Sequence, residues 1–187
     1  RIMAFSIEEF RNKGIFRGGA RPNLFQTVLS NVPAGVTLPV GSSEGAWTFV
    51  CKIAAIPAST MTAVEVPYFG RQVKVPGNRT FDNLSVTVIN DENFFVRNGL
   101  EQWMARMNGH ESNEQTVAPN DLLARMEVVH FGKEGDNVTI GDGTWTFENI
   151  FPVSLGEIAL DWGSNDTIEE YTVEFAYDYW SHGPRTN

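Results

Sequence analysis

The sequence contains a single cysteine, Cys51, no long apolar run and, from residue 134 to residue 184, no lysine or arginine. One cysteine cannot form an internal disulfide, which indicates a protein that folds in a reducing compartment. No stretch approaches the ~18–20 continuous apolar residues needed to cross a bilayer, so the sequence predicts no membrane span. The first thirty residues lack the apolar block of a secretory signal, and none is expected in the chain as given.

Motifs of the common catalytic and nucleotide-binding sites are also missing. The sequence has no GxxxxGK[ST] or GxGxxG loop for phosphates, no HExxH and no CxxC. Its three histidines, at positions 110, 130 and 182, are scattered, and its acidic turns at 135–143 and 161–166 lack the ligand spacing of a calcium loop. We therefore predict no metal, no cofactor and no enzymatic activity.

Charge is divided unevenly along the chain, whose net charge is −9. Residues 1–80 hold nine Lys and Arg against four Asp and Glu, whereas residues 81–187 hold five against nineteen. A protein that grips nucleic acid needs a basic surface to displace the counterions of phosphate, and the acidic half argues against one. The division suits pairing of the basic half of one copy with the acidic half of another, or a solvated acidic surface alone.

Hydrophobic periodicity predicts a chain that is mainly β. Alternation favours strands over 24–29, 47–54, 80–89, 123–131, 138–140, 144–151 and 158–162, and a hairpin with arms 64–68 and 72–75. Prolines place that hairpin at an edge or in a projection. The last predicted strand, 167–179, would run the length of the molecule at ~3.3 Å per residue.

One strong helix is predicted after Asn90 or Asp91, which can cap it. An apolar stripe at helical spacing forms its inner face: Val96, Leu100, Trp103 and Met107. Asn108-Gly109 is expected to stop it in a left-handed conformation, and a shorter helix is plausible over 3–12.

Together these elements predict one domain over residues 1–187, with a short helical or extended N-terminal arm of residues 1–22. The expected fold is an antiparallel β-sandwich or partly open β-barrel with one packed α-helix. Cys51, Phe81 and Trp162 are predicted core residues.

Five segments, in this order and spacing, resemble the tail tube protein of contractile-tailed bacteriophages. They are ARPNLFQ (20–26), FVCKIAAIPAS (49–59), VPGNRTFDNLSVTVINDEN (75–93), GEIALDW (156–162) and TVEFAYDYW (172–180). The resemblance implies a fold shared with the tubes of type VI secretion and of pyocins. It also implies hexameric rings that stack into a hollow tail tube for DNA ejection.

Further implications of the resemblance concern partners and location. A sheath surrounds such a tube, baseplate tube proteins start it, a tape-measure protein sets its length and a tail terminator ends it. The protein would then be a virion component assembled in the host cytoplasm. Alternatives within the same class are a tube protein of a type VI, extracellular injection or pyocin system, and a baseplate tube initiator. A carbohydrate-binding β-sandwich exposing Trp47, Trp145 or Trp162 is the alternative from a different class.

Two groups of residues follow as candidate surfaces. Residues for contacts between subunits or between rings are Arg17, Arg21, Tyr68, Arg71, Lys74 and Arg79, whose arginines could pair with acids of neighbouring copies. Acids for the lumen are Glu170, Glu174 and Asp178, on one face of the last predicted strand; these could instead face outward to the sheath. An acidic lumen would let DNA slide without binding, because like charge gives no counterion release.

Overall fold

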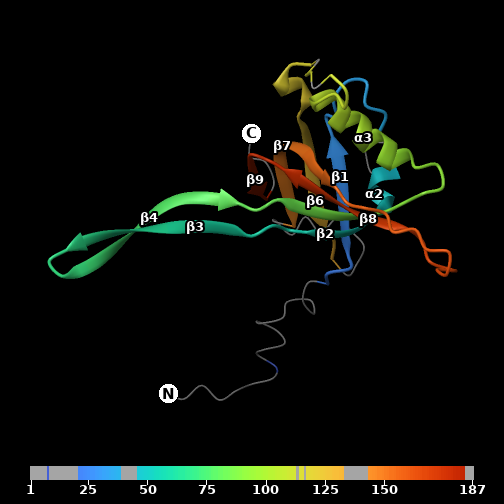
Figure 1. Cartoon of the computed structure of the whole chain (residues 1–187). Helices are drawn as coiled ribbons and strands as arrows, with labels where there is room; N and C mark the ends of the chain where they lie inside the picture. Colours follow the sequence, from blue (N-terminus) through green and yellow to red (C-terminus); the bar gives the residue numbers. More distant parts are fainter. Residues whose placement is uncertain are drawn as a thin grey trace.

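The structure, a computed structural model, describes residues 8, 21–38, 46–112, 114–115, 117–132 and 143–183. The predicted strand 138–140, Arg17 and all of the predicted helix 3–12 except Glu8 lie outside these residues. The described part of the chain is mainly β with one long helix (Figure 1), which confirms the predicted class.

Seven strands form an antiparallel sheet in the order β1-β6-β7-β8-β5-β2, with β9 also paired to β7. Their bounds are β1 Phe25–Ser30, β2 Cys51–Ala55, β5 Leu84–Ile89, β6 Ala124–His130, β7 Thr144–Leu155, β8 Glu170–Ala176 and β9 Tyr179–His182. The first half of β7 pairs with β6 and β9 and its second half with β8. Between these halves Asn149 has a φ of 58° and the register of β6 with β7 shifts, which is a β-bulge that bends β7.

The inner faces of both halves of the sheet meet in one hydrophobic cluster. Alternate residues of each strand supply it: Leu29, Val86, Val88, Met126, Val128, Phe147, Tyr171, Val173 and Phe175. Burying alternate apolar side chains on one face of each strand is what holds two packed layers together. The predicted alternation of Tyr171, Val173 and Phe175 with exposed Glu170 and Glu174 is confirmed.

Helix α3 (Phe95–Met107) lies against this sheet and buries the predicted stripe of Val96, Leu100 and Trp103. The indole Nε1 of Trp103 donates to the carbonyl of Leu122, at 2.8 Å, in the 3-10 helix η3 (Pro119–Leu122). A polar indole group therefore satisfies its hydrogen bond inside the core.

The two ends of α3 correct the sequence prediction. The helix begins at Phe95, after Phe94 in a left-handed conformation, and Asp91 acts from before the first turn by accepting the Phe95 N–H at 3.1 Å. It ends at Met107, but Asn108 is extended rather than left-handed, so the predicted left-handed stop is wrong.

Residues 46–54 differ most in type from the prediction. The short helix α2 (Ala46–Val50) replaces the first half of the predicted strand, and β2 keeps only its second half. Trp47 is buried from the helix, where its ring meets Phe175 edge-on at 6.0 Å. Ile53 is half-exposed because a bulge after Cys51 shifts the register with β5 and breaks the predicted apolar face.

The predicted strand 158–162 is absent, and Trp162 is fully exposed rather than in the core. Here the Asp161 carboxylate accepts the Gly163 N–H at 2.9 Å, and the Asp161 carbonyl accepts the Ser164 N–H. Such local bonds give the backbone a turn in place of a ladder.

The predicted long strand 167–179 is two strands, because the chain is interrupted at Tyr177-Asp178. Both pieces still run antiparallel along β7: Leu155 faces Val173 in β8, and Trp145 faces His182 in β9. The interruption lies beside the bend of β7, so the partner chain must bend with it.

Candidate assembly surfaces

The most prominent feature is a two-stranded arm, β3 (Ser59–Tyr68) and β4 (Arg71–Phe81), that projects far from the sheet (Figure 1). It is much longer than the predicted hairpin, and the predicted strand 80–89 divides into the end of β4 and all of β5. At ~3.3 Å per residue its strands extend roughly 35 Å. The prediction that this hairpin projects is confirmed.

The arm continues the pairing of β2 with β5. Ala55 faces Ser85 at the end of that pair, and Ser59 faces Phe81 at the start of the arm, so the register is unchanged across the junction and shifts only further out, between Met61 and Ala63. At the root, the Tyr177 hydroxyl donates to the Asp82 carbonyl at 2.7 Å, and the Phe81 ring, half-buried rather than core, packs on Tyr177. Burial, and to a lesser extent the negative charge of Asp82, raises the pKa of Tyr177 to about 12.

The two faces of the arm differ in chemistry. Val64 faces Val75 and Val66 faces Val73 across the strands, so four valines line one face, each about half-exposed. The other face carries a Glu65–Lys74 ion pair at 3.7 Å. A two-stranded hairpin is marginal in water without something packed on it. Within the described chain nothing covers this valine face.

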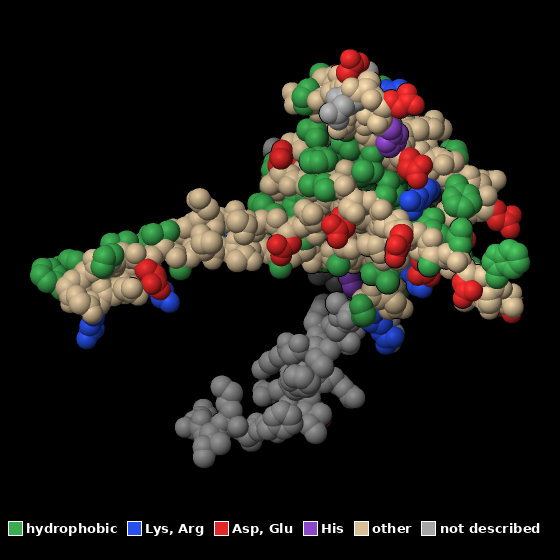
Figure 2. Space-filling view, in the orientation of Figure 1, with side chains coloured by type: hydrophobic (Ala, Val, Ile, Leu, Met, Phe, Trp, Pro, Cys, Tyr) green, Lys and Arg blue, Asp and Glu red, His purple; other side chains and the backbone are tan. Residues whose placement is uncertain are grey.

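The tip of the arm is aromatic and basic. Phe69 and Gly70 form a two-residue turn with φ of 42° and 77°, the positive values that a tight hairpin of this twist requires. Tyr68 and Phe69 meet edge-on at 4.7 Å and are 64% and 91% exposed. Figure 2 shows hydrophobic side chains with Lys and Arg at this end of the molecule.

Four of the six predicted contact residues lie on the arm and are exposed. Tyr68 and Arg71 face each other at the tip, Lys74 lies further along β4, and Arg79 is opposite Met61 near the root. Arg21 is exposed on the body, before β1. The structure thus brings together the residues of the arm and leaves Arg21 apart from them.

The three predicted lumen acids are exposed but have different surroundings. Glu170 forms an ion pair with Lys52 at 2.5 Å, and Asp178 accepts the side-chain N–H of Asn149 at 2.6 Å. Glu174 lies between Ser85 of β5 and Ser154 of β7 and forms no ion pair with another described residue. Glu170 is therefore paired with a positive charge, Asp178 is hydrogen-bonded to a neutral amide, and Glu174 carries its charge on an otherwise neutral stretch of sheet.

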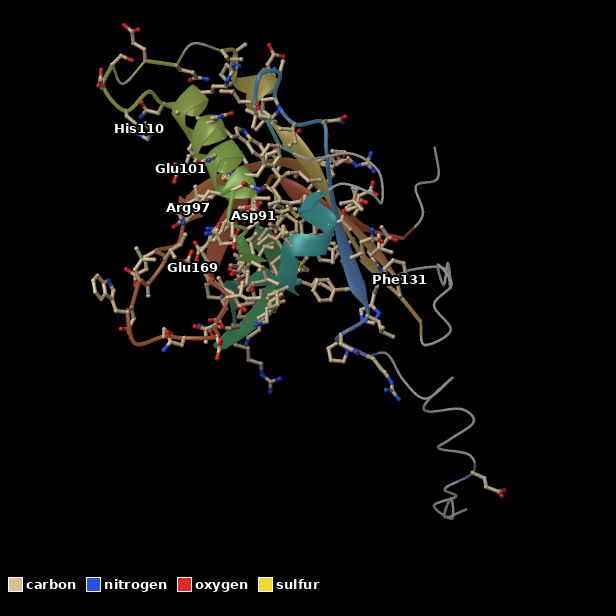
Figure 3. All side chains as sticks on the ribbon, turned by 90° about the vertical axis from the view of Figure 1, so that its right-hand side faces the viewer. Asp91, Arg97, Glu101, His110, Phe131 and Glu169 are labelled. Carbon is tan, nitrogen blue, oxygen red and sulfur yellow. The ribbon has the colours of Figure 1, made fainter. Side chains whose placement is uncertain are left out.

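A second projecting feature, which sequence reasoning missed, is the loop over residues 156–169, called here the acidic loop. It leaves the body on the side opposite the arm (Figure 1) and carries fully exposed Trp162. Its base is held by α3 and by the segment before it: Arg97 of α3 donates to the Gly156 carbonyl at 2.8 Å, and Asn90, which follows β5, donates to the Glu169 carboxylate at 2.9 Å. Figure 3 shows Arg97 with Glu101, Asp91 and Glu169 at this junction.

The described residues hold no arrangement suited to metal chemistry or thiol reactivity. No group of three or more His, Cys, Asp or Glu among them could hold a metal ion. Cys51 is a buried core residue, as predicted, and burial raises its pKa to about 12 despite an opposing contribution from Thr27. Burial of Trp47 removes it from the sugar-stacking residues considered above. No described helix is long and apolar enough to span a membrane.

A β-sandwich with a long uncovered arm is typical of a subunit that completes its packing by assembly. The comparisons agree. Residues 20–183 match the family model described as phage tail tube protein, and the chain belongs to this family. It is 31% identical over 161 residues to "Tail tube protein gp19" of Enterobacteria phage T4, covering 86% of this chain and 90% of that one.

Solved structures share the fold. The tube-terminating cap of the anti-feeding prophage covers 98% of this chain and 99% of its own, with a TM-score of 0.63 and 15% identity. The sheath/tube terminator of an extracellular contractile injection system covers 86% and 94%, with a TM-score of 0.60 and 16% identity. The protein is accordingly a tail tube protein of a contractile tail system and a virion component, and its homologues are structural proteins rather than enzymes.

Proposed function

We propose that six copies of this chain, each folded as one domain, form a ring, and that rings stack into the inner tube through which phage DNA leaves the particle. The observation that carries the proposal is the uncovered valine face of the arm. Each of its four valines keeps about half of its surface in water. Covering this apolar area with a neighbouring subunit lowers the free energy of the assembly. A contact between different surfaces of identical subunits repeats, and so generates rings and stacks.

In this proposal the arm reaches the next ring. Tyr68, Arg71 and Lys74 lie at its outer end and make that contact, and Arg79 acts nearer the root. Arg21 on the body, and Arg17 before it, pair with acids of neighbouring copies in the same ring. Such charged contacts fix the register between subunits more than they raise the affinity.

The lumen is lined by the outer face of β8. Glu174 repeats around the ring on a surface of serines and threonines, and Asp178 and ion-paired Glu170 lie along the same strand direction. DNA passing such a wall displaces no counterions, so it is not held.

Outside the ring the partners are the sheath, the baseplate tube proteins, the tape-measure protein and the tail terminator, and assembly takes place in the host cytoplasm. The two solved structures of similar fold, a sheath/tube terminator and a tube-terminating cap, support the sheath and the tail terminator among these partners.

A cryo-EM reconstruction of tubes formed by the concentrated protein, or isolated from tails, tests the proposal. We expect six-fold rings with the arm crossing between rings and Glu174 facing the lumen. A monomeric protein at every concentration, on baseplates as well as alone, would refute the tube. Rings with Glu174 on the outer wall would refute only the lumen assignment.

The lumen assignment has a functional test in phage. Glu174→Lys is expected to assemble normally but to slow or arrest DNA ejection, because six lysines per ring would bind phosphate. Glu114→Lys, which changes an exposed acid away from the sheet, is the matched control. Equal ejection by both variants would count against an acidic channel.

A further inference from the structure

The acidic loop presents apolar side chains that nothing in the described chain covers. Leu160, Trp162 and Ile168 are 79%, 102% and 71% exposed. Large exposed aromatic residues of this kind are enriched where proteins bind one another. Among the residues that the structure describes, the loop therefore carries the most exposed apolar side chains outside the arm.

The two ends of the loop are held by the body of the same subunit. Its first residue, Gly156, donates to the Thr172 carbonyl and accepts from Arg97, whose guanidinium lies over the Tyr171 ring at 5.0 Å. Its last residue, Glu169, accepts both the backbone and the side-chain N–H of Asn90. Holding both ends reduces the conformational entropy that the loop loses on binding.

Charge limits the kind of partner. Glu157, Asp161 and Asp166 are exposed among the apolar residues of the loop, and the sequence has no Lys or Arg from residue 134 to residue 184. A partner must therefore combine apolar groups with positive charge. In Figure 2 hydrophobic and acidic side chains gather on the side of the molecule that faces away from the arm.

We propose that the acidic loop is the docking site for the arm tip of a second copy of this chain. The tip supplies the complement: Tyr68 and Phe69 as exposed aromatics, with Arg71 and Lys74 beside them. Arm and loop project from opposite sides of the body (Figure 1), so the arm tip of one copy cannot reach the loop of the same copy. The contact must therefore join different copies, and it repeats from copy to copy. This inference rests on the proposed tube and names the surface that receives the arm.

Cross-linking through introduced cysteines tests the contact directly. Gln72→Cys places a thiol beside the arm tip and Ser164→Cys places one in the loop, and both positions are exposed. Buried Cys51 contributes no background. In assembled tubes treated with a short bis-maleimide, the double variant should give a ladder of covalent multimers on a denaturing gel, because each chain links to two others.

The controls separate this contact from random collisions. Each single-cysteine variant should give dimers at most, and Gln72→Cys with Glu114→Cys, an exposed site after α3 and away from the loop, should give no ladder. A ladder in that control, or tubes without a ladder in the test variant, would overturn the docking site and leave the tube intact. Absence of hollow filaments in negative stain would refute both proposals.

Charge exchange gives a second, independent readout. Arg71→Glu, and separately Glu157→Lys with Asp161→Asn, should each raise the critical concentration for tube formation at least tenfold at low salt. Combining the arm and loop changes in one chain should recover most of that loss, because the signs again complement each other. Glu111→Lys with Glu114→Gln is the matched control and should have no effect.

The loop could instead receive the sheath, and the same variants decide this. If the loop variant forms tubes at the wild-type concentration but no longer binds sheath protein, the docking site for the arm is wrong. Recovery in the combined variant cannot arise from a sheath contact, since purified tube protein contains no sheath.

Discussion

The valine face of the arm makes assembly sensitive to two substitutions that leave the subunit itself unchanged. Val66 and Val73 face each other across the strands and are 47% and 51% exposed. Burying a whole valine contributes ~1.5–3 kcal/mol, so covering the remaining half of each contributes roughly 0.75–1.5 kcal/mol. Threonine keeps one methyl, but its hydroxyl must be desolvated in the interface, which offsets what that methyl contributes.

The double variant Val66→Thr/Val73→Thr should therefore lose about 1.5–3 kcal/mol per arm contact, and its critical concentration should rise about 10- to 150-fold. Threonine is as compatible with a strand as valine, so the melting temperature of the unassembled subunit should not change. The assay is sedimentation of polymer across a concentration series, with negative stain to confirm tubes.

Gln72→Thr, on the opposite face of the arm, is the matched control. If the valine variant and this control both polymerise within twofold of the wild type, the valine face is not buried in the tube. The reasoning from exposed apolar area would then be refuted, whatever other contact holds the rings together.

Three further predictions concern the body. Gly99→Ala should lower the free energy of unfolding by about 1–3 kcal/mol in denaturant melts, because its Cβ would lie 2.6 Å from Leu38 and 2.8 Å from the Thr37 carbonyl; an unchanged midpoint would show that this segment moves freely. Cys51 should react with a thiol reagent at pH 8 only as fast as the chain unfolds, since its pKa is raised to about 12. Burial, and then the nearby Asp82, raises the pKa of Tyr177 to about 12 in the folded state, whereas an unfolded tyrosine ionises near pH ~10. Stability should therefore fall from pH 10 upward, and Tyr177→Phe should lessen that fall.

Those parts of the fold that bury their apolar face within the chain could be predicted from the sequence. The stripe of α3 and the alternation of Tyr171, Val173 and Phe175 in β8 are both buried as their spacing indicates. Periodicity reports which side chains are removed from water. It succeeds where the covering surface belongs to the same chain.

The same reasoning failed where no described part of the chain covers the apolar face, or where local hydrogen bonds let the backbone form a turn instead of a strand. Ile158, Leu160 and Trp162 alternate like a strand, but the Asp161 turn removes them from any ladder. The second strand of the arm was predicted too short because Pro76 was expected to end it, and Pro67 inside the first strand was expected only to place the hairpin at an edge or in a projection. Each arm strand pairs only with the other and so has one free edge, where a proline costs no ladder bond.

Candidate contact residues were found from charge and from the hairpin signal, which is why most of them lie together on the arm. The acidic loop was missed because its acids were attributed to turns and its tryptophan to the core. The available signal was the combination of an exposed-turn motif, Asp161 to Gly163, with large apolar residues on both sides.

The shared register of arm and body has a consequence for assembly. β5 lies between β2 and β8, where Val86 and Val88 are fully buried, and β4 enters it across only two residues. The direction of the arm is therefore set by the packing of the core, supported at the root by Phe81 and Tyr177. A subunit with a loosened core would present its arm over a range of angles and would pay the entropy of fixing it at each contact. A tube with a regular repeat consequently requires the tightly packed strands from which the arm grows.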